Sequence, residues 1–149
     1  MSLHSFIRFF HLLFAALFIG SFTAMALLWT RGRLGDAQSQ RLSAIEVMIF
    51  IGQRLATVAS SVLLLAGVLL IIDQPSVLYM GALLHVKIVA GVLLVAGSHL
   101  THLKAKKART ALLEGRKDAV SEKYLDITTW VIPALAFIVM FLGVMISHG

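Results

Sequence analysis

The stretch LLHVKIVAGVLLVAGSHLTHL, residues 83–103, has the length and the apolar content of a membrane span. About 20 mainly apolar residues are enough for a helix to cross the hydrocarbon core of a bilayer. His85 and Lys87 nevertheless interrupt its first third, and His99 and His102 lie at its end. A base or a cation is costly inside a membrane and tends to mark a functional position. The stretch therefore predicts a membrane helix whose polar residues have something to bind.

The rest of the chain has the composition of a membrane protein. Of its 149 residues, 59% are hydrophobic and only 13% are charged. Apolar segments at about 5–30, 42–72, 79–103 and 124–147 predict an all-α, integral membrane four-helix bundle that forms a single transmembrane domain, 1–149. The absence of cysteine excludes disulfides, zinc–thiolate sites, thiol catalysis and the covalent attachment of a c-type haem.

The distribution of basic residues predicts the orientation. Most of them lie in or beside the two loops that follow the first and third spans, namely Arg31, Arg33, Arg41, Lys104, Lys106, Lys107, Arg109, Arg116, Lys117 and Lys123. Basic loops stay on the cytoplasmic side, so both termini are expected outside a cell inner (cytoplasmic) membrane. The same residues are expected to contact lipid headgroups, which makes the lipid bilayer the partner and excludes nucleic acid.

Two histidines lie at the same expected depth. His11 and His85 are each six residues from the outer end of a span, so both should lie about 9 Å below the outer surface. A b-type haem takes axial nitrogens from opposite sides of its iron, and these two histidines are the predicted ligands. Arg8 lies one turn nearer the water on the His11 face, where it can pair with a propionate. The alternative is that each histidine bonds a backbone carbonyl and that Arg8 snorkels to the interface.

A second, inner level carries His99, about 21 Å along the same helix from His85. An inner haem would need another ligand, and Met25 or Met48 lies at a plausible depth. Methionines in helices are usually core residues, and a hydrated histidine at the membrane boundary costs little, so this inner site stays open.

The remaining cations, Arg54 and Lys87, differ in depth. Arg54 is expected near the inner boundary, where it binds a ligand or pairs with Glu46 or Asp126. Lys87 is expected about 12 Å deep and about 200° around the helix from His85, so the two cannot point into one narrow slot. The depth of Lys87 predicts a contact with an anionic ligand.

The chain resembles the HemJ-type protoporphyrinogen IX oxidases in three segments and in the basic loop before the fourth span. The segments are FFHLLFAALFIG (residues 9–20), RLSAIEV (residues 41–47) and LLHVKIVAGVLLVAGSH (residues 83–99). CopD-like membrane domains share the general pattern. The resemblance covers nearly the whole chain, and its most specific element is His-x-Lys at His85 and Lys87. It implies haem b, bound at His11 and His85, and a catalytic role for Lys87. The chain differs from the family in reading ATVASS in its second span and YLDITTWVIP at the start of its fourth.

By this resemblance the chain is a membrane haem b protein in electron transfer. It would oxidise protoporphyrinogen IX to protoporphyrin IX and pass the electrons to a quinone or a respiratory partner. The carboxylates of such a tetrapyrrole suit Arg8 and Lys87. Two alternatives remain: a CopD-like copper transport protein that uses histidines and methionines as soft ligands, and a structural or accessory subunit of a larger membrane complex. Small residues at Gly81, Gly91 and Gly97 would permit close packing, including that of a homo-oligomer.

Overall fold

The computed structural model describes residues 3–35, 37–76 and 81–146. In chain order they form α1 (Leu3–Leu34), α2 (Gln38–Ile51), the π-helix η1 (Gly52–Ala56), α3 (Thr57–Asp73), α4 (Ala82–Leu113) and α5 (Ala119–Ile146). Because α2, η1 and α3 follow one another without a break, the described residues make four rods. Each rod contains a segment long and apolar enough to cross a membrane. The predicted all-α, four-helix membrane bundle is thereby confirmed.

Most of the expected spans continue as helix beyond their predicted ends. The largest extension is in α4, which ends at Leu113, ten residues past the predicted end. Residues 104–113 read KAKKARTALL, and most of them are strong helix formers, so the helix continues out of the apolar segment. The predicted boundaries at 79 and 147, and the last part of the predicted turn at 73–78, lie outside the described residues.

A capping interaction starts the last helix. The backbone N–H of Ser121 donates to Asp118 Oδ1 at 3.0 Å, and its hydroxyl donates to Oδ2 at 2.6 Å. These bonds satisfy donors that the first turn of a helix leaves free. The Ser121 hydroxyl, and then the Ser121 backbone N–H, hold the pKa of the Asp118 carboxyl below its usual value.

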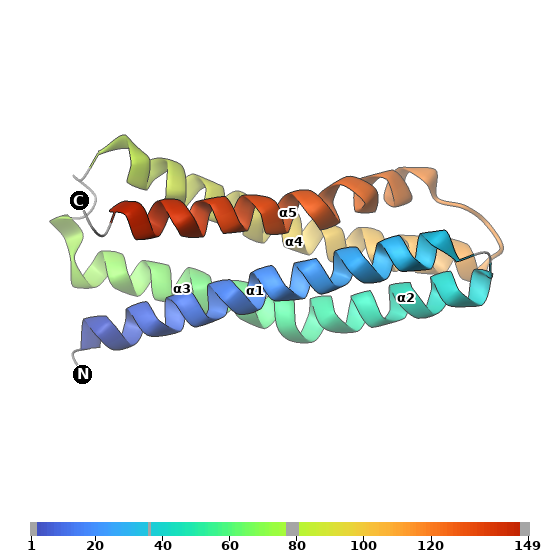
Figure 1. The fold of residues 1–149 in the computed structure, drawn as a ribbon, viewed down its shortest axis with the longest axis horizontal. Helices are drawn as coiled ribbons and strands as arrows, with labels where there is room; N and C mark the ends of the chain where they lie inside the picture. Colours follow the sequence, from blue (N-terminus) through green and yellow to red (C-terminus); the bar gives the residue numbers. More distant parts are fainter. Residues whose placement is uncertain (1–2, 36, 77–80, 147–149) are drawn as a thin grey trace.

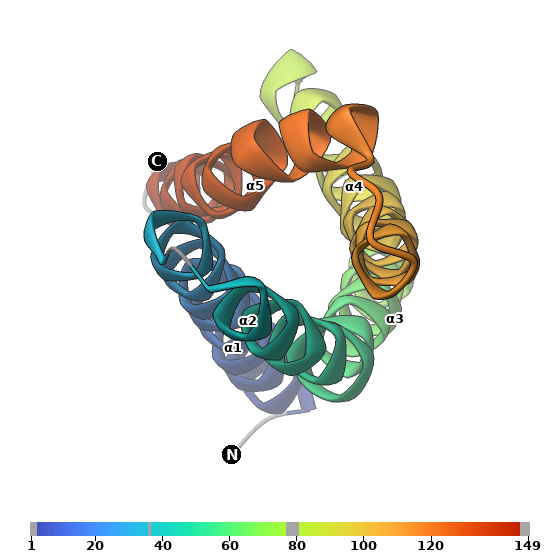
Figure 2. The same ribbon diagram turned by 90° about the vertical axis from the view of Figure 1, so that its right-hand side faces the viewer.

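The four rods run alternately up and down, so Leu3 and Ile146 lie at one end of the bundle (Figure 1). We call this the terminal end, and we call the opposite end, with the loops that follow α1 and α4, the basic end. Figure 2 looks along the bundle from the basic end and shows the helices arranged around a ring. Going round that ring, α3 packs on α1, α1 on α5, and α5 on α4.

The buried core lies toward the basic end. Its main members are Phe18, Phe22, Met25 and Trp29 of α1, Ile45 and Met48 of α2, Ala105, Ala108 and Leu112 of α4, and Leu125 and Ile132 of α5. No described side chain of α1 before Phe18 is buried, and none of α4 before Ser98 is. The hydrophobic effect therefore holds the helices together mainly in the half nearer the basic end.

Polar contacts between helices reinforce the same half. Asp126 of α5 accepts hydrogen bonds from Trp29 Nε1, at 2.7 Å, and from Arg33, both on α1. Two further ion pairs, each at 3.1 Å, join α2 to α5 through Arg41 and Glu122, and α2 to α4 through Glu46 and Arg109. By contrast, α4 makes few contacts with α3, and its first turns lie away from that helix (Figure 1). The bundle is closed at the basic end and parted between α3 and α4 at the terminal end.

Candidate functional site

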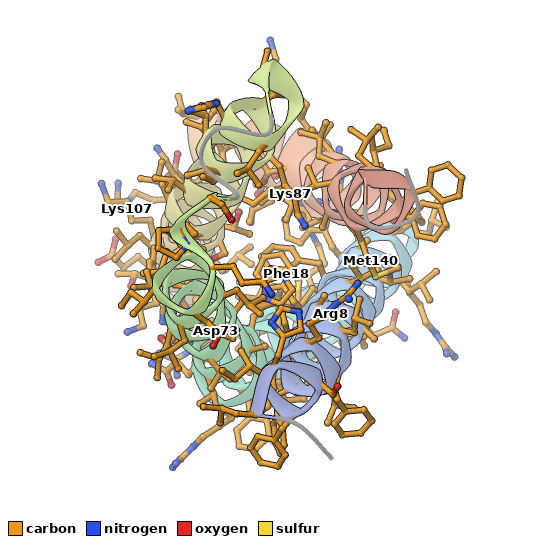
Figure 3. The ribbon with its side chains drawn as sticks, turned by 90° about the vertical axis from the view of Figure 1, so that its left-hand side faces the viewer. Arg8, Phe18, Asp73, Lys87, Lys107 and Met140 are labelled. Atoms are coloured by element: carbon orange, nitrogen blue, oxygen red, sulfur yellow. The ribbon has the colours of Figure 1, made fainter. Side chains whose placement is uncertain are left out.

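Three basic side chains come together in the terminal half. Arg8 and His11 are three residues apart on α1 and therefore share a face of that helix. Lys87 of α4 points into the middle of the bundle, and Arg8 reaches the same interior from the other side (Figure 3). Lys87 interacts electrostatically with both His11 and Arg8. We call Arg8, His11 and Lys87 the cation cluster.

His11 has one ring nitrogen without a partner. Its ring lies beside the backbone carbonyl of Leu63 on α3, and its Cε1 would be 4.0 Å from a Cβ placed on Gly67. Its Nδ1 is buried and makes no hydrogen bond. A buried polar atom without a partner is uncommon in native proteins and calls for an explanation such as a ligand.

No carboxylate balances the cation cluster among the described residues. Asp73 is the one described acid near the terminal end (Figure 3), and its Oδ2 is 2.8 Å from His4 Nδ1. The other described acids lie on helices near the basic end or in its loops. Lys87 is partly buried, whereas Arg8 is exposed. A partly buried cation with no acid in reach is unfavourable on its own, so Lys87 favours an anionic ligand.

His85 does not face His11. Its side chain is exposed, and its Nδ1 lies 3.2 Å from the carbonyl oxygen of Gly81 on its own helix. Residues two apart on a helix point about 200° apart, so His85 points outward when Lys87 points inward. The two histidines were paired by depth, and depth carries no information about rotation. The described residues therefore bring Arg8, His11 and Lys87 together and leave His85 outside this group. They do not fit a haem held between His11 and His85.

His99 and Arg54 lie apart from the cation cluster. His99 is exposed on α4, and Arg54 is exposed on η1. The acids expected as partners of Arg54 bond elsewhere: Glu46 pairs with Arg109, and Asp126 with Trp29 and Arg33.

At the inner level, the histidine that faces the bundle interior is His102. With Met25 and Met48 it lines a small cavity, and the sequence analysis had placed this residue at the membrane boundary. A signal for its inward direction was present in the sequence. Ser98, Thr101 and Ala105 are small residues at helical spacing around it, and all three are buried.

Comparison of this chain with known protein families, with curated proteins and with solved structures gives no match. The class of protein is set by the fold: four apolar helices make this a multi-pass membrane protein. Its particular activity has to be argued from the cation cluster.

Proposed function

We propose that this protein binds an anionic tetrapyrrole in the terminal half of its bundle and acts there as a membrane haem b oxidoreductase. The observation that carries the proposal is the cation cluster: two cations and a histidine with a free, buried ring nitrogen, with no balancing acid among the described residues. The resemblance of the sequence to the HemJ-type oxidases supports the same ligand class.

Each residue of the cluster has a role in this proposal. His11 Nδ1, which is buried and has no partner, would hold the iron. Arg8 would make a charge-assisted hydrogen bond to a haem carboxylate and Lys87 to a substrate carboxylate, and such bonds are stronger than bonds between neutral groups. Haem b, when bound, supplies a one-electron carrier. Because α3 and α4 make few contacts with each other, we expect an amphiphilic ligand to enter from the bilayer between them.

The substrate in this proposal is a porphyrinogen, and protoporphyrinogen IX is the one that the resemblance implies. Its oxidation to the porphyrin removes electrons and protons together, so an acceptor is needed. A quinone or a respiratory membrane partner takes the electrons. Lys87 holds a substrate carboxylate and so orients the ring. With the basic end in the cytoplasm of a bacterial-type inner membrane, the cation cluster would lie in the outer half of the membrane.

The proposal is tested by the optical spectrum and the haem content of the purified protein. Wild-type protein is expected to retain haem with clear reduced-minus-oxidised bands, and His11→Ala to lose them. Porphyrinogen oxidation is then followed in membranes that carry each variant, with a quinone as acceptor. His99→Ala is the matched control, since this exposed histidine lies outside the cluster.

Two results would overturn the proposal. One is wild-type protein that neither retains haem nor takes it up from added haemin. The other is a His11→Ala variant with the same spectrum and the same turnover as wild type. Either result would leave the protein as a structural or accessory subunit of a membrane complex.

A further inference from the structure

A small cavity lies in the half of the bundle that the proposed function does not use. It has a volume of about 10 Å³, close to the least that holds one water molecule. The side chains that border it come from α1, α2, η1, α3 and α4, and they include Phe22, Met25, Met48, Thr57, Ser98, Thr101 and His102. No acid is among them.

Three potential metal donors meet at this cavity. His102 Nδ1 is buried and has no hydrogen-bond partner. A Cβ placed on Gly52 would lie 3.2 Å from His102 Nδ1 and 3.8 Å from Met25 Sδ, so both donors border the space above this glycine. Met48 is 1% exposed and lines the same space. The site thus offers an imidazole nitrogen and the Met25 sulfur beside Gly52, with a second methionine, Met48, in its lining.

The backbone under the cavity is irregular. Gly52 begins the π-helix η1, and its carbonyl oxygen accepts both the backbone N–H and the hydroxyl of Thr57, the latter at 2.8 Å. Single π-turns inside α-helices are frequent at functional sites. Here the π-turn places Gly52 beside His102. Because glycine has no Cβ, the space next to His102 Nδ1 stays empty.

A buried water in this cavity would find acceptors but no hydroxyl donor. The three hydroxyls that line it all donate to carbonyls of their own rod: Thr57 to Gly52, Ser98 to Val95, and Thr101 to Gly97. No lining hydroxyl is therefore left to donate to a water, whereas buried waters typically make about three hydrogen bonds.

The donors and the charges around them select the kind of ion. Thioether sulfur and imidazole suit soft metals such as Cu(I), whereas carboxylate and carbonyl oxygens suit hard ones. The nearby charged groups that act on His102 are Lys106 and His99, both basic. With no acid in the lining, a monovalent ion is favoured over a divalent one. Among the described residues no three histidines or acids gather around a possible metal ion, so the methionines are essential here.

We propose that His102, Met25 and Met48 form a binding site for one Cu(I) ion, between η1 and α4. The site is independent of the cation cluster, because it shares no residue with it and lies in the packed half of the bundle. Binding requires only side-chain adjustment, and methionine is flexible enough to supply it.

The test is a titration of the detergent-purified protein with Cu(I), under anaerobic conditions and against a chromogenic Cu(I) chelator. Wild-type protein is expected to bind one equivalent. Met25→Leu and Met48→Leu keep most of the volume but remove the sulfur. Each should weaken binding at least about tenfold, since even the loss of a group behind a ligand weakens metal binding 10- to 100-fold. X-ray absorption of the bound ion should show both sulfur and nitrogen neighbours.

Two further variants keep the result interpretable. Gly52→Ala should block the site without removing a donor, because its Cβ would press on His102 Nδ1. Met140→Leu, on α5 outside the cavity, should bind as wild type does. Unfolding temperatures confirm that each variant is folded. The proposal is wrong if wild-type protein binds no Cu(I) in competition with the chelator, or if folded Met25→Leu and Met48→Leu variants bind as tightly as Met140→Leu.

Discussion

Replacing Lys87 with methionine should change ligand binding and stability in opposite directions. Methionine keeps much of the volume of lysine but removes the charge and the hydrogen-bond donors. In the ligand-free protein, Lys87 is a partly buried cation that interacts unfavourably with Arg8 and has no acid partner among the described residues. In the proposed complex, the same charge would pair with a carboxylate of the ligand. Lys87→Met therefore removes an unfavourable charge from the ligand-free protein and a favourable contact from the complex.

The sizes of the two effects follow from these contacts. Losing one charge-assisted contact costs about 1.5–3 kcal/mol, which is roughly 10- to 150-fold in affinity. Repulsion between two like charges across the interior, at an effective dielectric constant of about 20, is on the order of 1 kcal/mol. Lys87→Met should therefore raise the unfolding temperature of the ligand-free protein while weakening tetrapyrrole binding at least about tenfold. Lys87→Arg should restore only part of the binding, because a planar fork replaces a compact ammonium.

Fluorescence titration with protoporphyrin IX measures the binding, and a thermal melt in detergent measures the stability. Lys107→Met is the matched control, since Lys107 is exposed on the same helix and points away from the bundle (Figure 3). Unchanged porphyrin affinity in Lys87→Met would remove Lys87 from the site. A lower unfolding temperature would show that the charge is balanced by an unrecognised partner.

Three other substitutions test the remaining conclusions. His11→Ala should abolish the haem spectrum, whereas His85→Ala should retain it, because His85 is exposed and bonds its own helix; loss of haem in both variants would restore the paired-histidine arrangement. Asp126→Ala should lower the free energy of unfolding by about 1–3 kcal/mol, since it leaves the buried Trp29 indole N–H unpaired, while Glu114→Ala at an exposed pair should change it by less than about 1 kcal/mol in the same melts. Cysteines placed at Gln74 and Lys107, both exposed, should react with membrane-impermeant reagents from the outer and the cytoplasmic side respectively, and labelling of Gln74 from the cytoplasm would reverse the orientation.

The number and place of the spans could be predicted because hydropathy alone decides them. The helical ends were less well predicted, since residues 104–109 carry four basic side chains that end the apolar segment and yet are strong helix formers. The π-helix at Gly52 could not be predicted. A local change from an α-turn to a π-turn leaves the hydropathy pattern unchanged. The π-helix can be understood only from how η1 packs against α4.

For the site, the sequence supplied depth but not direction. Counting residues placed Arg8 and His11 on one face and Lys87 about 200° from His85. It could not say which of Lys87 and His85 points inward, because that depends on how α4 is turned against α5. The inward direction of His102 could have been inferred from the small residues Ser98, Thr101 and Ala105 on its side of the helix, because small residues allow close packing.

The parting of α3 from α4 has a consequence for motion. The apolar contacts and ion pairs of this bundle are concentrated at the basic end, so local separation of the helices should cost least free energy at the terminal end. Backbone amide hydrogens in the first turns of α4 and the last turns of α3 should therefore exchange with water much faster than those around Trp29. A ligand that bridges Arg8 and Lys87 would draw the two helices together. Ligand binding should then slow amide hydrogen exchange at the terminal end and leave it unchanged at the basic end.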